Sequence, residues 1–156
     1  MVREREQNSI KVVAYGVIPY NNGFIYVVTA KDGMIGLPGG KIESFEGIND
    51  AVVREISEEI GVEVVVRNIV GIDQFRSKGG SPIVSVSYSC EIVEGVPHII
   101  RPNEIKAILS PALAEVRTFY REGKLRSGEV SLRPLERYLR GEIYPLNLIQ
   151  TLISGN

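Results

Sequence analysis

The sequence predicts an α+β fold built as one domain. Runs of β-branched and aromatic residues fill most of the first two thirds of the chain, and such runs are typical of strands. One early segment instead repeats its aliphatic residues every four positions, as an amphipathic helix does. Helix signals dominate the last third. Because 156 residues suit one hydrophobic core better than two, we expect residues 1–156 to form a single domain.

Two strands joined by a tight turn are predicted near the start. Residues 10–20, IKVVAYGVIPY, are the first strand, and residues 24–30 are the returning strand. The Asn-Asn-Gly sequence at 21–23 favours a hairpin turn, because Asn and Gly adopt positive φ at low cost. Residues 31–40 hold four glycines and are expected to form a loop.

A helix is predicted over residues 48–60, where aliphatic residues at every fourth position form one apolar stripe. The stripe consists of Ile48, Val52, Ile56 and Ile60. Gly61 follows as the C-terminal stop, because glycine readily adopts the left-handed conformation that ends helices. Strands are then expected at 62–75, 83–93 and 105–109.

Two helical regions are expected in the last third. A Ser-Pro pair at 110–111 resembles an N-cap followed by proline at the first helical position, and that helix would run over 112–120. A final helical region would cover 132–152, broken at Gly141 and Pro145.

The composition excludes several classes of function. The net charge of −1 leaves no overall basic field to recruit nucleic acid, so an anionic ligand must be held by local positive groups or by a metal. No run of 18 apolar residues is present to span a membrane, and the charged first residues lack an apolar signal core, which together predict a cytoplasmic protein. Cys90 is the single cysteine, so no internal disulfide is possible, and we expect it to be buried in a strand.

One motif carries most of the functional information. Residues 40–62, GKIESFEGINDAVVREISEEIGV, fit the pattern G-x5-E-x7-R-E-U-x-E-E-x-G-U without mismatch, where U is an aliphatic residue. The fixed positions are Gly40, Glu46, Arg54, Glu55, Ile56, Glu58, Glu59, Gly61 and Val62. At about 100° per helical residue, Glu55 and Glu59 point within ~40° of each other, and Glu58 lies ~60° to the other side of Glu55.

The three carboxylates therefore share one side of the helix, and they need compensation. Like charges three and four residues apart repel by about a few tenths of a kcal/mol per pair, and the helix dipole is unfavourable to them near the C-terminus. Hard divalent cations prefer oxygen ligands and would offset the repulsion. A solvated acidic face is the ordinary alternative, but the aliphatic stripe and the glycines also stand at the required spacings.

This motif is the Nudix box, and the chain resembles Nudix hydrolases of the MutT type. The resemblance implies the Nudix α/β/α sandwich with a mixed central β-sheet. It also implies metal-dependent hydrolysis of a nucleoside diphosphate linked to another group, such as an NTP, a nucleotide sugar or ADP-ribose. Mg²⁺ is the expected ion, with Mn²⁺ as a substitute. The partner would be a nucleotide-derived small molecule, with no membrane and no extended nucleic-acid site. Homodimers are common in the family, and residues 144–153 are candidates for such an interface.

The resemblance also assigns roles to the motif. The implied metal ligands are Glu55, Glu58, Glu59 and the carbonyl of Gly39. Glu55 is either a ligand or a base in the family. Glu46 resembles a supporting acid that contacts the metal through water. Arg54 resembles the residue that orients the motif's glutamates by a salt bridge.

The general base has two possible sources in the family. Some members use a glutamate of the motif, and others use a glutamate on a later loop, just before a strand that leads into a helix. Residues 101–111, RPNEIKAILSP, resemble that context, which makes Glu104 the best distal candidate. Glu91 and Glu94 are the alternatives. His98, the only histidine, is expected to be exposed and uninvolved, and a histidine-rich zinc site is excluded.

Substrate identity is less well defined. The family's ADP-ribose hydrolases tend to carry a proline, and its diadenosine polyphosphate hydrolases a tyrosine, at a place that falls on residues 77–80 here, which contain neither. Some side chains outside the motif are candidates to hold phosphate or stack on a base, with ordinary strand and loop roles as the alternative. They are Lys31, Phe75, Arg76, Lys78 and Tyr88.

Other functions stay open. A Nudix-fold regulator would bind a nucleotide without hydrolysing it, but such proteins usually lose carboxylates of the motif. An isopentenyl diphosphate isomerase would share the fold but needs a catalytic cysteine and more histidines near the metal. A purely structural or interaction module has no positive feature in this sequence.

Overall fold

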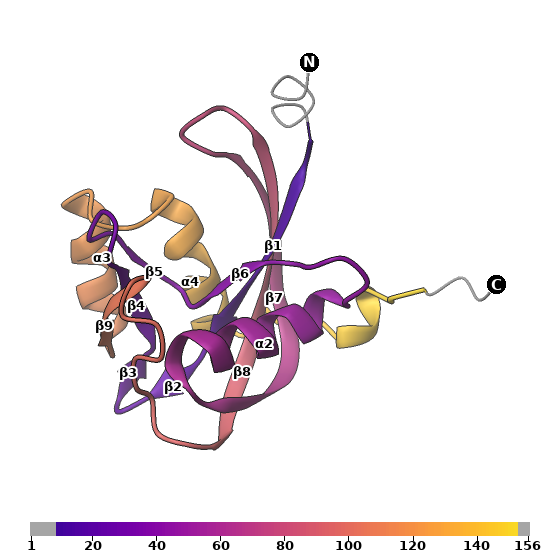
Figure 1. Ribbon diagram of the computed structural model, residues 1–156, viewed down its shortest axis with the longest axis horizontal. Coiled ribbons are helices and arrows are strands. Elements are labelled where there is room, and N and C mark those ends of the chain that lie inside the picture. Colours follow the sequence, from indigo (N-terminus) through magenta and orange to yellow (C-terminus); the bar gives the residue numbers. More distant parts are fainter. Residues whose placement is uncertain (1–8, 153–156) are drawn as a thin grey trace.

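The computed structural model describes residues 9–152, and it has the expected α+β architecture with a mixed central sheet (Figure 1). That sheet has four strands in the order β6-β1-β8-β7. β1 (Lys11–Val17) pairs in parallel with β8 (Pro82–Glu94) and antiparallel with β6 (Gly39–Lys41). β7 (Glu63–Arg76) is the other edge and pairs antiparallel with β8. Figure 1 shows the tip of the β7–β8 hairpin projecting beyond the rest of the molecule.

A smaller antiparallel sheet has the order β5-β4-β9. Its central strand is β4 (Tyr26–Thr29), between β5 (Ile35–Gly36) and β9 (Ile105–Leu109). The expectation of a plain loop over 31–40 is wrong, because β5 lies within this segment and β6 (Gly39–Lys41) begins in it. These strands have only two and three residues, which is too short for an alternating pattern to reveal them.

The predicted hairpin turn forms between β2 (Pro19–Tyr20) and β3 (Gly23–Phe24). The backbone φ angle is 47° at Asn21 and 60° at Asn22. Positive φ at both central residues is what a two-residue hairpin turn with the right twist requires, and asparagine tolerates it.

Helix α2 (Ile48–Ile60) has the bounds that the aliphatic spacing predicts. Val52, Ile56 and Ile60 are fully buried, and the helix lies across one face of the central sheet (Figure 1). Gly61 ends the helix with φ 66°, and its N–H donates to the carbonyl of Ser57. Packing of this stripe fixes which side of α2 its polar residues present.

Helix α3 (Leu113–Arg121) starts after Ala112, so the prediction of Ser110 as N-cap is wrong. The Ser110 hydroxyl instead donates to the carbonyl of Tyr20, in the distant β2 strand. The Ser-Pro pair predicted that the Ser110 side chain would cap the helix, but this side chain makes a tertiary hydrogen bond instead.

The final helical region is broken as predicted. It contains the helix α4 (Arg133–Leu139), which ends before Gly141, and the single turn η2 (Leu146–Leu148) after Pro145. A further turn, η1 (Gly128–Ser131), precedes α4. α4 contacts β1 and β7, and so lies on the central sheet.

Two clusters of buried side chains form the core. One lies between α2 and the central sheet and contains Cys90, which is 2% exposed as expected. The other contains Leu37, Val116 and Leu135 and joins the small sheet to α3 and α4. No helix in the described part of the chain is long and apolar enough to cross a membrane. The cytoplasmic location stays a prediction.

Candidate active site

Arg54 gathers the acidic residues of the motif. Its Nε and Nη2 atoms donate to the two carboxylate oxygens of Glu46 at 2.9 and 2.8 Å. Its Nη1 atom donates to Glu55 and to Glu58, each at 3.1 Å. Nη2 also donates to the carbonyl of Lys41 at 3.1 Å. One guanidinium therefore links the end of β6, the loop before α2 and the helix itself.

This network is partly shielded from water. The side chains of Arg54, Glu46 and Glu55 are 22%, 17% and 19% exposed. The hydrogen bond from Arg54 lowers the pKa of Glu46 below its ordinary value. The pKa of Arg54 is raised, mainly by the same bond. Both groups stay charged, so Arg54 keeps three carboxylates oriented on one side of the helix.

Glu59 points away from this network, towards the chain segment just before the motif. Its side chain is buried, with 8% of the residue exposed, and its Oε1 atom accepts the N–H of Gly39 at 3.4 Å. Its Oε2 atom is buried without a hydrogen-bond partner in the described residues. Burial raises the pKa of Glu59 to about 8, the charge of Glu55 adds to the rise, and that of Arg126 opposes it.

Two glycines leave room for the carboxylates. A Cβ atom on Gly40 would lie 2.7 Å from the carboxyl carbon of Glu55, so this side chain rests directly on the main chain. Gly39 has φ 144°, and a Cβ there would lie 2.0 Å from the carbonyl oxygen of Ala14. Burial raises the pKa of Glu55, while Arg54 opposes the rise. Glycine is therefore required at position 40 by the contact with Glu55. At position 39 it is required by the positive φ angle and by the contact with Ala14.

The donor atoms are oxygens, the type that a hard divalent cation prefers, but their side chains are not grouped around one point. In residues 9–152, no three Asp, Glu, His or Cys side chains are placed to hold a metal ion as they stand. Arg54 lies between Glu55 and Glu58, and Glu59 turns to Gly39. All these donors are oxygens, as Mg²⁺ prefers, and an unpartnered buried carboxylate oxygen is a group for which a bound ion is a ready explanation.

The compensation expected from a cation is supplied in part by arginines. Arg54 contacts Glu55 and Glu58, and Arg101 Nη2 lies 3.5 Å from Glu58 Oε2. Arginines therefore offset part of the charge of Glu55 and Glu58, and a bound cation at the cluster stays a prediction. Glu59 has no such neighbour in ion-pair contact within the described residues.

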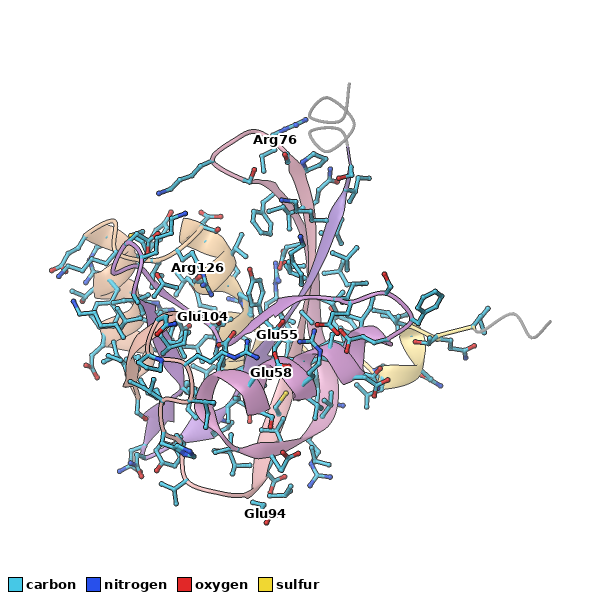
Figure 2. The ribbon with its side chains drawn as sticks, in the orientation of Figure 1. Glu55, Glu58, Arg76, Glu94, Glu104 and Arg126 are labelled. Atoms are coloured by element: carbon cyan, nitrogen blue, oxygen red, sulfur yellow. The ribbon has the colours of Figure 1, made fainter. Side chains whose placement is uncertain are left out.

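Glu104 lies near the motif, in the predicted place directly before β9. Arg101 connects them, because its Nη1 atom lies 3.7 Å from Glu104 Oε2 and its Nη2 atom contacts Glu58. Figure 2 shows Glu104, Glu55 and Glu58 in the same central region, with Glu94 at the far lower end of the molecule.

The alternative bases are not brought to this region. Glu91 accepts hydrogen bonds from Arg67 at 2.8 and 3.0 Å, and both side chains are exposed. Glu94 pairs with Glu63 at the end of the β7–β8 ladder. Among contacts of the described residues, Glu104 is the one distal candidate linked to the motif, through Arg101.

The loop that carries Glu104 is fastened to the end of α2. The His98 N–H donates to the carbonyl of Ile60 at 3.0 Å, and the Ile100 N–H to that of Glu59 at 3.4 Å. The His98 ring lies over Gly61, where a Cβ would be 2.3 Å from Cε1. His98 is exposed, as expected, but it contributes packing that positions the loop.

Within residues 9–152, none of the candidate substrate-binding side chains makes a hydrogen bond or ion pair with the carboxylates of the motif. Tyr88 is 2% exposed within the core, so the prediction that it contacts substrate is wrong. Arg76 lies at the tip of the β7–β8 hairpin, away from Glu55 and Glu58 (Figure 2). Phe75 lines a pocket of about 380 Å³ between β7 and the start of α4. Lys31 and Lys78 are exposed.

Sequence reasoning missed Arg101 and Arg126. Arg101 stands three residues before Glu104 in the same short turn, and this closeness in the sequence was a usable signal for an ion pair. Arg126 gave no local signal. It approaches Glu59 because the chain near residue 125 pairs with β5, which only the tertiary structure reveals.

Comparison with known proteins agrees with this geometry. Residues 10–130 match the family model of the NUDIX domain. A curated relative from Methanocaldococcus jannaschii, named ADP-ribose pyrophosphatase, is 29% identical over 90 residues, which are 54% of this chain and 52% of that protein. An uncharacterized Nudix hydrolase of Bacillus subtilis, YvcI, is 44% identical over 48 residues, 31% of this chain and 30% of that protein. The matches thus span about half, or less, of these relatives.

The fold has close counterparts among solved structures. A NUDIX hydrolase from Nitrosomonas europaea superposes with a TM-score of 0.82 at 22% identity, over 92% of this chain and 98% of that one. At this identity the likeness concerns the fold alone.

Proposed function

Because this chain belongs to the NUDIX family, we propose that it is a metal-dependent pyrophosphohydrolase that cleaves a nucleoside diphosphate linked to another group. The observation that carries the proposal is the arrangement of Glu55, Glu58 and Glu59. Two of these carboxylates are held by Arg54, and the third is buried against Gly39 with an unpartnered oxygen. We take residues 1–156 as the single domain that performs the reaction.

The proposed metal ligands are Glu55, Glu58, Glu59 and the carbonyl of Gly39. A bound Mg²⁺, or Mn²⁺ in its place, would supply charge neutralisation on the diphosphate and a water of lowered pKa. The all-oxygen donor set and the buried Oε2 atom of Glu59 support this assignment. Burial raises the pKa of Glu59 to about 8, so a cation bound there would displace a proton near neutral pH, and its affinity would rise with pH.

The remaining catalytic work falls to the chain's own side chains. Arg54 holds Glu58 and Glu55 in one orientation. We propose Glu104 as general base, since it is 59% exposed to water and Arg101 ties it to Glu58. Its carboxylate would accept a proton from the attacking water as that oxygen bonds to phosphorus, while the anhydride bond breaks and the second phosphate leaves.

The substrate is proposed to be a small nucleotide derivative. The similar protein from Methanocaldococcus jannaschii bears the name ADP-ribose pyrophosphatase, so ADP-ribose belongs in the first assay beside NTPs and nucleotide sugars. Phe75 offers an aromatic face to a base, and Lys31 and Arg76 offer charge for phosphate. Arg76 would need to move to serve this role, because it lies on the hairpin tip (Figure 2).

The decisive test is Glu58→Gln, assayed on this substrate panel with Mg²⁺ and with Mn²⁺. We expect turnover to fall by about 10²- to 10⁴-fold, with an unchanged far-UV circular dichroism spectrum. Glu94→Gln is the matched control, because it removes a carboxylate far from the motif and should leave turnover within about twofold. Near-normal hydrolysis by Glu58→Gln on every substrate that the parent accepts would refute the proposal.

A regulator that binds nucleotides without hydrolysis is the second candidate. Nucleotide binding without any product release in the same panel would favour it. A homodimer is also proposed, because Leu148 and Leu152 are 60% and 85% exposed, although Leu146 and Ile149 of the same stretch pack on the core. Ile153, which was part of the predicted interface, lies outside the described residues. Light scattering after gel filtration would give the mass.

A further inference from the structure

We propose that Arg126 forms a phosphate-binding subsite close to Glu59 and holds a phosphate of the substrate there. This inference rests on the proposed function, because the ligand is a phosphate of the molecule that is hydrolysed. Arg126 lies outside residues 40–62, so the motif assigns it no role.

Arg126 is fastened to the segment that leads into the motif. Its N–H donates to the carbonyl of Ile35 at 2.7 Å, and the Ile35 N–H donates to the carbonyl of Lys124 at 2.9 Å. Its side-chain Nη2 atom donates to the carbonyl of Leu37 at 3.1 Å, across 89 positions of sequence. The guanidinium therefore has a fixed place beside the chain that runs from β5 to β6.

The absence of a side chain at Gly36 leaves space for this guanidinium. A Cβ atom there would lie 2.8 Å from Nη2, 2.9 Å from Nε and 3.1 Å from Cζ of Arg126. The group thus lies flat against the main chain at residue 36. Gly36 is not among the residues with positive φ, so its backbone conformation does not demand glycine. The missing side chain serves the close approach of the arginine.

The charge of Arg126 lacks a partner. It is half-buried, yet within the described residues it makes no ion pair, whereas Arg54, Arg101 and Arg137 each contact a carboxylate. The bond to Leu37 uses one of five N–H donors. A partly shielded guanidinium with unused donors favours an anion, and phosphate matches its planar fork.

The surroundings place this anion at the reaction centre. Arg126 donates to the carbonyl of Leu37, two residues before Gly39, and the N–H of Gly39 donates to Glu59. Tyr15 pairs with Gly39 in the central sheet, and its hydroxyl makes no hydrogen bond within the described part of the chain. In Figure 2, Arg126 and Glu104 lie on the same side of Glu55. A phosphate on Arg126 would therefore border the buried end of the carboxylate cluster.

The test compares Arg126→Ala with Arg121→Ala, which removes an exposed arginine at the end of α3 whose one side-chain hydrogen-bond partner within residues 9–152 is Thr118. Arg126→Ala should raise KM and weaken the binding of ADP, measured by calorimetry, by about 10- to 100-fold, as expected for a lost hydrogen bond to a charged group. Arg121→Ala should change neither. Arg126→Lys should lie between, because it keeps the charge but loses the fork.

Gly36→Ala provides an independent arm. It leaves the charge in place but displaces the guanidinium, so it should reproduce the loss of ADP affinity. Combined with Arg126→Ala it should add nothing, because the colliding group is gone.

The outcomes separate this proposal from the proposed function. ADP affinity and KM within twofold of the parent in Arg126→Ala, or a further loss of affinity in the double variant, would overturn the subsite. If the parent hydrolyses nothing but binds ADP, and Arg126→Ala does not bind it, the subsite stands while the enzymatic proposal fails.

Discussion

Replacing Arg54 with alanine should destabilise the metal-free protein by about 2–4 kcal/mol. The guanidinium donates four hydrogen bonds to carboxylates and one to a backbone carbonyl. An exposed ion pair contributes about 0–1 kcal/mol, whereas breaking a buried one costs about 3–5 kcal/mol. Arg54 lies between these limits, because it and Glu46 are 22% and 17% exposed.

The chain contains a matched control in Arg67. Its guanidinium donates two hydrogen bonds to Glu91 at 3.0 and 2.8 Å, distances close to those between Arg54 and Glu46. However, Arg67 and Glu91 are 57% and 61% exposed. Arg67→Ala should therefore cost only about 0–1 kcal/mol. Both variants remove an arginine–glutamate pair of similar geometry. The difference in stability loss between them therefore reports the effect of shielding from water and of the additional carboxylates at Arg54.

Urea and thermal unfolding with EDTA present would measure both variants. A domain of this size loses about 2–4 °C of Tm per kcal/mol, so Arg54→Ala should unfold about 5–15 °C below the parent and Arg67→Ala within about 4 °C of it. If the two variants lose equal stability, then Arg54 does not hold the cluster together, and the reasoning from shielding is wrong.

Three further outcomes are expected. Because the native pKa of Glu59 is about 8 against an ordinary 4.5, the native state binds the proton more tightly than the unfolded state between these values. The free energy of unfolding should thus fall as pH rises from 5 to 8 without metal, and urea titrations of Glu59→Gln should show less of this fall. Gly39→Ala should lose more than about 3 kcal/mol, since its Cβ would lie 2.0 Å from the carbonyl oxygen of Ala14; a normal Tm would contradict that packing. Cys90, buried and with a pKa of about 12, should resist thiol reagents at pH 8 until urea unfolds the protein, and rapid native labelling would show that the strand is accessible.

The sequence predicted well those elements whose causes are local. Helix α2 has the predicted bounds, because the aliphatic stripe and Gly61 act within a few turns of the chain. The turn at Asn21 and Asn22 is likewise set by the φ preferences of its own residues. The N-cap at Ser110 failed, since its hydroxyl bonds to Tyr20 and that partner is 90 positions away.

For the candidate site too, the residues that were predicted correctly are those whose signal is local in the sequence. The glutamates and Arg54 were predictable because they lie within one motif, whose resemblance to the Nudix box implied the salt bridges of Arg54. Tyr88 was misjudged, although β8 alternates serine with larger residues and so places Tyr88 on the same face as Val86 and Cys90, with which it packs in the core. Arg126 was out of reach, because its position depends on a pairing with β5.

The glycines before α2 explain how so many charges come together on a small surface. Gly40 lets the carboxylate of Glu55 rest on the main chain, and Gly36 does the same for the guanidinium of Arg126. Glu59 then accepts the N–H of Gly39, between these two contacts. Opposite charges therefore contact the same short backbone segment, at Gly36 and at Gly40. If that is the purpose of the glycines, this segment, more than α2, sets how closely a phosphate can approach the carboxylates, and a single methyl group at residue 36 should alter ligand affinity without touching the motif.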